Sequence, residues 1–74
     1  MNWYFTFGNH YTRDGVCLRD YWVRVTAPTL EEARRIFDKE FAEVYMDRVG
    51  IYSRAYPEEE FDSQFFPQGE YIKL

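Results

Sequence analysis

The sequence predicts an α+β fold: a small antiparallel sheet (element order β-β-α-β-α-β) covered on one face by a long amphipathic helix plus a short second helix. Two patterns indicate this class. Residues 2–8 alternate with the period of a strand, and residues 30–49 repeat apolar side chains at helical spacing. The chain has 74 residues, enough for one hydrophobic core, so we expect a single domain over residues 1–74.

Two strands are predicted in the first third of the chain, over residues 2–8 and 18–26. We expect them to pair antiparallel, since Asp14-Gly15 between them is a typical tight-turn dipeptide. Their connection is either a long loop or an extension of the hairpin. The alternation places one set of side chains toward the helix: Trp3, Phe5, Phe7, Tyr21, Val23 and Val25.

The long helix is predicted to run for about 20 residues from Leu30. Thr29 and Glu32 form a capping box at its start. Arg48 and Gly50 are the expected stop signals. The stripe that covers the sheet comprises Leu30, Ala33, Ile36, Phe37, Phe41, Val44, Tyr45 and Val49.

Three shorter elements follow the helix. Residues 51–56 and 70–74 alternate as short strands. Between them, Pro57 occupies the favoured first position of a second helix, with three glutamates in its first turn. Phe61 and Phe65 are four residues apart, so we expect one edge of this helix to pack on the core.

The amino-acid composition indicates the cellular compartment and the charge of a binding partner. The single cysteine forms no intrachain disulfide, and no segment approaches the roughly 18 apolar residues of a membrane span, so we expect a cytoplasmic protein that is neither exported nor membrane-embedded. The net charge of −4 argues against direct nucleic-acid binding and fits a basic partner, or simply solubility. Residues 36–74 hold nine acidic residues against four basic ones.

Catalysis and metal binding find little support in the residues. His10 and Cys17 form the one candidate pair for nucleophilic catalysis, but a lone thiol in a strand is typically a small buried hydrophobe. A structural zinc site needs four nitrogen or sulfur ligands, and this chain has two. No glycine motif for binding phosphate is present. We therefore expect no enzyme, no metal and no cofactor.

Acidic residues give the first functional lead. On the long helix, Glu40, Glu43 and Asp47 are three and four apart and share one edge. If a second acidic cluster lies on the same side, the two form a ridge that resembles a nucleic-acid backbone. Alternatively, the first cluster is an ordinary solvated helix face and the second complements a helix dipole. The second cluster comprises Glu58, Glu59, Glu60 and Asp62.

Aromatic residues give a second lead. Tyr4, Trp22 and Tyr52 are expected on the sheet face away from the long helix, with no predicted element over them. An uncovered Tyr/Trp surface is typical of protein interfaces. The alternative is that residues 9–17 or the second helix fold over this face. Stacking on single-stranded nucleic acid is disfavoured by the net charge.

Several segments together resemble a group of small proteins from phages and mobile elements. The similarity lies in residues 3–8 (WYFTFG), 29–34 (TLEEAR), 58–61 (EEEF) and 67–71 (PQGEY). The helix of such relatives tends to end in a Gly-Trp-Ala-Phe-like stretch, where this chain has Val-Gly-Ile-Tyr at 49–52. Short, acidic members of this kind include anti-CRISPR proteins, among them inhibitors of type I surveillance complexes.

The resemblance implies an anti-CRISPR-like inhibitor that binds a host CRISPR effector through an acidic, nucleic-acid-mimicking surface and blocks DNA binding. We expect a protein partner of the type I surveillance kind in the host cytoplasm, no direct contact with nucleic acid or membrane, and a monomer or weak dimer. The alternative is a general protein-interaction module that uses the aromatic sheet face. The expected partner-binding residues are Glu40, Glu43, Asp47, Glu58, Glu59, Glu60, Asp62, Trp22 and Tyr52.

Overall fold

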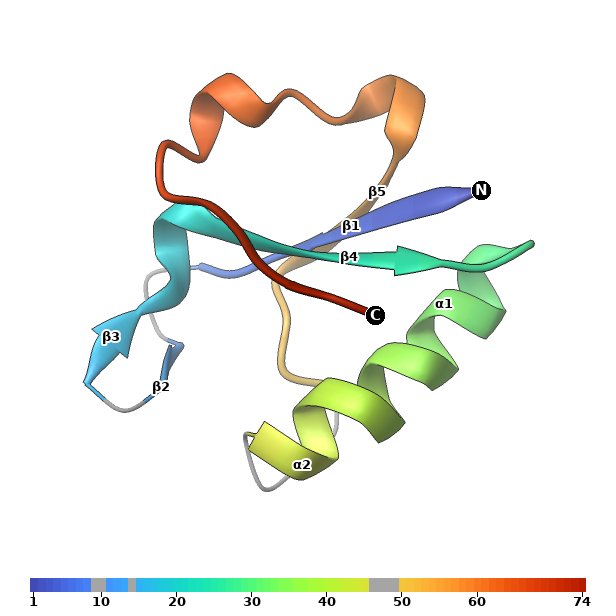
Figure 1. Cartoon of the computed structure of the whole chain (residues 1–74), viewed down its shortest axis with the longest axis horizontal. Coiled ribbons are helices and arrows are strands. Elements are labelled where there is room, and N and C mark those ends of the chain that lie inside the picture. Colours follow the sequence, from blue (N-terminus) through green and yellow to red (C-terminus); the bar gives the residue numbers. More distant parts are fainter. Residues whose placement is uncertain (9–10, 14, 46–49) are drawn as a thin grey trace.

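A four-stranded sheet with the order β5-β1-β4-β6 organises the chain (Figure 1). The computed structural model describes residues 1–8, 11–13, 15–45 and 50–74. The α+β class is confirmed. The strands are β1 (Asn2–Thr6), β4 (Tyr21–Thr26), β5 (Arg54–Pro57) and β6 (Gly69–Lys73).

The sheet is mixed, so the prediction of an antiparallel sheet is wrong at the last strand. β1 pairs antiparallel with β4 and with β5, as alternation and turn signals predicted for β1 and β4. β6 instead pairs parallel with β4. Strands β5 and β6 therefore run in the same direction at opposite edges, and the chain between them has to cross a face of the sheet. We call residues 58–68 the crossover segment.

The connection from β1 to β4 contains its own hairpin. β2 (Thr12–Arg13) and β3 (Val16–Cys17) pair antiparallel, and Gly15 in their turn has φ +80°. Asp14 of the predicted turn lies outside the described residues. A 3₁₀ turn, η1 (Leu18–Asp20), follows and buries Leu18 completely, so the second long strand begins at Tyr21 and not at residue 18.

The helical stretch begins where the capping box predicts. The Thr29 hydroxyl accepts a hydrogen bond from the Glu32 backbone N–H at 3.2 Å, and α1 runs over Leu30–Phe37. A single regular helix over 30–49 is wrong, because the chain continues as a π-helical segment, η2 (Asp38–Ala42), before α2 (Glu43–Tyr45). Hydrogen bonds in a π turn join residues five apart, and Ala42, five residues after Phe37, is completely buried as Phe37 is. The predicted end at Arg48 lies outside the described residues.

The main core lies between the sheet and this helical stretch. Trp3, Phe5 and Phe7 face it as predicted, and Phe5 stacks on Phe37 of α1 at a ring-centroid distance of 4.5 Å. Tyr52 also packs here, edge-on to Phe5 at 4.9 Å, so its predicted place on the opposite face is wrong. The reason is that β5 begins only at Arg54, and the alternation assumed over 51–56 does not extend to Tyr52.

The predicted second helix is not formed. Residues 58–65 make two 3₁₀ turns, η3 (Glu58–Glu60) and η4 (Ser63–Phe65), with extended backbone at Phe61 and Asp62 between them. The Asp62 carboxylate accepts a hydrogen bond from the Gln64 N–H at 3.0 Å and so begins a new turn in place of continuing the old one. The segment lies across the sheet from the helix (Figure 1), whereas one covered face was predicted.

Candidate functional site

The sheet face away from the helix is covered by one aromatic side chain of the crossover segment. Phe61 stacks on Tyr4 of β1 with ring centroids 4.3 Å apart and nearly parallel planes, and its ring lies 5.2 Å from that of Trp22 on β4. Tyr4 is consequently only 9% exposed. The predicted uncovered aromatic face is therefore wrong, and the alternative that residues after β5 fold over it is the one observed.

Polar contacts fasten both ends of the crossover segment. The Glu58 carboxylate accepts hydrogen bonds from Asn2 Nδ2 at 3.0 Å and from the Tyr4 hydroxyl at 3.1 Å. At the other end, the Gln68 N–H donates to the Asp20 carbonyl at 3.1 Å. The segment is thus tied to the N-terminal strand and to the start of β4.

These contacts shift the pKa values of Glu58 and Tyr4 in opposite directions. Hydrogen bonds from Asn2 and then Tyr4 stabilise the carboxylate and lower the pKa of Glu58 below its ordinary value. Burial, followed by the hydrogen bond to Glu58, raises the pKa of the Tyr4 hydroxyl. Both shifts favour a neutral phenol at Tyr4 beside a charged carboxylate at Glu58.

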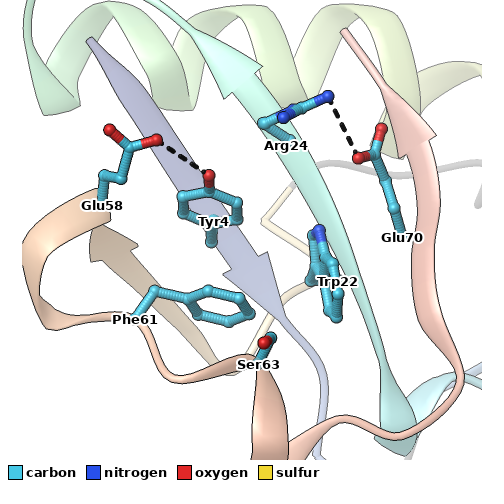
Figure 2. Close-up of a pocket in the computed structure, with 7 residues that line it drawn as sticks. All are labelled: Tyr4, Trp22, Arg24, Glu58, Phe61, Ser63 and Glu70. Atoms are coloured by element: carbon cyan, nitrogen blue, oxygen red, sulfur yellow. Dashed lines mark hydrogen bonds and ion pairs between the residues drawn. The ribbon is translucent and has the colours of Figure 1, made fainter.

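A cavity of about 320 Å³, the sheet-face pocket, opens beside the Tyr4–Phe61 stack (Figure 2). Arg24 and Glu70 on one side form an ion pair at 3.2 Å. The indole nitrogen of Trp22 points toward Arg24, and both Trp22 Nε1 and Arg24 Nε are buried without a hydrogen-bond acceptor among the described residues. The lining residues are Tyr4, Trp22, Arg24, Glu58, Phe61, Ser63 and Glu70.

A second cavity of about 200 Å³, the aromatic pocket, is also lined by Phe61. Phe61 and Phe66 stack with centroids 5.4 Å apart, and Phe65 forms an outer wall with 74% of its surface exposed. The sequence predicted that Phe65 would join the core. The lining residues are Tyr56, Glu60, Phe61, Asp62, Phe65 and Phe66.

The two acidic clusters do not converge. Glu40 and Glu43 are exposed on the helical side, and Asp47 lies outside the described residues. Glu58, Glu59, Glu60 and Asp62 are on the crossover segment, across the sheet. The single acidic ridge expected from both predicted helices is therefore wrong, because the crossover carries its carboxylates to the opposite face. Of the predicted aromatic anchors, Trp22 lines the sheet-face pocket and Tyr52 packs in the main core.

The groups considered for catalysis are not brought together in the described part of the chain. Cys17 is exposed in β3, so the interpretation of its thiol as a buried hydrophobe is wrong, and His10 lies outside the described residues. Within 1–8, 11–13, 15–45 and 50–74, no three His, Cys, Asp or Glu side chains are grouped to hold a metal ion. No helix among these residues has the length and apolar character needed to cross a lipid bilayer.

The aromatic pocket is the feature that sequence reasoning missed. The signal was present in Asp62-Ser63, a typical start of a new turn, which divides the glutamate run from Phe65 and Phe66.

Comparisons with protein-family models, with curated proteins and with solved structures gave no match to this chain. Function is therefore inferred from the geometry of the crossover segment.

Proposed function

We propose that this chain acts by binding, not by catalysis, and that its crossover segment contacts a positively charged surface of a protein partner. The observation that carries the proposal is the 74% exposure of Phe65, at the mouth of an aromatic pocket whose charged lining residues are Glu60 and Asp62. A large exposed ring beside a pocket is typical of the residues that contribute most to protein interfaces.

The charges of the segment support a cationic partner. Glu59 and Glu60 are exposed, and no described residue forms an ion pair or a side-chain hydrogen bond with either. Their charge is therefore available to a partner, whereas Glu58 is held by Asn2 and Tyr4. Uncompensated carboxylates around an apolar contact accelerate association with a basic surface and exclude acidic ones.

The resemblance to phage anti-CRISPR proteins makes one partner the first to test. A CRISPR effector of the type I surveillance kind has to present a basic groove to its nucleic acid, and the crossover segment would occupy part of that groove and block DNA binding. The acidic surface in this proposal is one segment, residues 58–62 with Phe65, and not the two-helix ridge that the sequence predicted.

The test is an equilibrium measurement of duplex DNA binding to a purified type I surveillance complex, with increasing amounts of this protein. We expect the wild-type chain to release DNA from the complex, and a Phe65→Ala variant to need about tenfold more protein. Because Phe65 is mostly exposed, this variant should keep its fold, which circular dichroism can verify. No release of DNA by the folded wild-type protein would contradict the proposed inhibition.

A further inference from the structure

The two pockets differ in whether a basic residue balances the carboxylates that line them. In the sheet-face pocket, Glu70 forms an ion pair with Arg24, and Glu58 accepts two hydrogen bonds. The aromatic pocket has Glu60, with no hydrogen-bond or ion-pair partner among the described residues, and Asp62, whose carboxylate accepts a hydrogen bond from the Gln64 N–H. Its charged lining is acidic without a counter-charge, so this pocket is complementary to a cation.

The apolar walls of the aromatic pocket favour a particular kind of cation. Phe61 is stacked between Tyr4 and Phe66, so the rings of Tyr56, Phe65 and Phe66 are the walls left to meet a ligand, and Phe65 is mostly exposed. Aromatic faces attract cations, and the methylene stems of long basic side chains cover apolar surface. A volume of about 200 Å³ restricts the occupant to one side chain and not a folded element.

We propose that the aromatic pocket binds one arginine side chain of the partner protein. The methylene stem lies against the phenylalanine rings, and the guanidinium reaches the carboxylates of Glu60 and Asp62. Arginine fits better than lysine, because its planar group stacks on rings and donates several hydrogen bonds to carboxylates at once. The inference specifies the residue that a partner would present and so rests on the proposed function, but the pocket can be tested without that partner.

The first test titrates the isotopically labelled full chain with the peptide acetyl-Gly-Arg-Gly-amide and follows backbone amide shifts by NMR. The matched control peptide contains citrulline, which has the shape of arginine without its charge. We expect saturable shifts confined to residues 56–66. The citrulline peptide should bind at least about fivefold more weakly than the arginine peptide, and a peptide with lysine in place of arginine should have an intermediate affinity. Equal shifts with arginine and citrulline, or arginine shifts mapping to the helical stretch, would overturn the proposal.

Variants of the chain provide the second test. Glu60→Gln and Phe65→Ala each remove one side of the site at an exposed position, and each should weaken arginine-peptide binding by about fivefold. Glu31→Gln, an exposed change on α1, is the matched control and should leave binding unchanged. Unaltered binding by Glu60→Gln and Phe65→Ala would overturn the arginine site. Arginine-peptide binding together with no effect on the surveillance complex would retain the pocket and reject only that partner.

Discussion

The two faces of the sheet are covered in different ways, and the difference separates stability from recognition. On the helical side, Phe5, Phe37 and Phe41 are completely buried. On the crossover side, Phe61 is only partly buried, Trp22 remains half-buried, and Phe61 lines two pockets.

Aromatic residues on the two faces of one sheet are thus buried to different extents, because different elements cover the two faces. A helical stretch places a side chain on the sheet at every turn and excludes water from the whole face. The crossover segment has two short 3₁₀ turns and sends one ring, Phe61, down between Tyr4 and Phe66. Gaps remain beside that ring, and we place partner recognition there.

The largest expected effect is on the helical side. Phe37→Ala removes a completely buried ring that stacks on Phe5, and should lower the free energy of unfolding by about 3–5 kcal/mol, measured by urea denaturation. In a domain this small, that loss is a large part of the total. The matched Phe65→Ala change should stay within about 0.5 kcal/mol, because Phe65 is mostly exposed. Similar losses from both changes would remove the distinction between the two faces.

Phe61→Ala tests how the crossover side is held. The ring is partly exposed but stacks on both Tyr4 and Phe66, so we expect a smaller loss of about 2 kcal/mol in the same denaturation experiment. Burial is the main cause of the raised pKa of Tyr4, so the same change should move that pKa back toward 10.0, as spectrophotometric titration would detect. An unaltered tyrosine titration would show that Phe61 does not shield Tyr4.

The start of the helix should contribute less than either ring. Thr29→Ala removes the hydroxyl that accepts from the Glu32 N–H, and should destabilise the fold by about 1 kcal/mol in thermal or urea unfolding. Thr29→Ser keeps the acceptor and is the matched control, with an expected loss of a few tenths of that value. If serine were as harmful as alanine, the hydroxyl would not be the stabilising group.

The smallest effect concerns the attachment of the crossover segment at acid pH. The pKa of Glu58 is lowered in the fold, so its carboxylate stabilises the protein above the ordinary value of 4.5, and this contribution is lost as the pH falls through the lower, folded pKa. The difference in unfolding free energy between wild type and Glu58→Gln should therefore shrink as urea titrations move from pH 6 toward pH 3. When Asn2→Ala is already present, adding Glu58→Gln should lower the free energy of unfolding by less at neutral pH. The reason is that Asn2 is the main cause of the lowered pKa of Glu58. A difference independent of pH would contradict this assignment.

The sequence predicted those features that depend on local periodicity. Alternation in β1 correctly separated Trp3 and Phe5 from Tyr4, and the Thr29 cap correctly marked the start of α1. Alternation does not reveal what covers each face, because that depends on the direction in which a distant strand joins the sheet. Parallel pairing of β6 with β4 sent residues 58–68 across the face that was predicted to be open.

The remaining differences have equally specific causes. The pattern of apolar residues in 30–49 is compatible with both α and π turns, and in the structure Phe41 and Ala42 are completely buried in a π segment. In the crossover segment, the side chain of Asp62 competes with a continuous helix, and the separation of Phe61 from Phe65 follows from it. Residues on both sides of that break line the aromatic pocket.

In the proposed complex, the crossover segment, and not the helical stretch, contacts the partner. The most direct measurement compares the affinity for the surveillance complex of two matched double variants, Glu59→Lys/Glu60→Lys and Glu40→Lys/Glu43→Lys, over a series of salt concentrations. Charge reversal in the crossover segment should lower the affinity by about 100-fold and weaken its salt dependence, whereas reversal on the helix should change the affinity little. Loss of affinity from the helix variant alone would contradict the proposed complex.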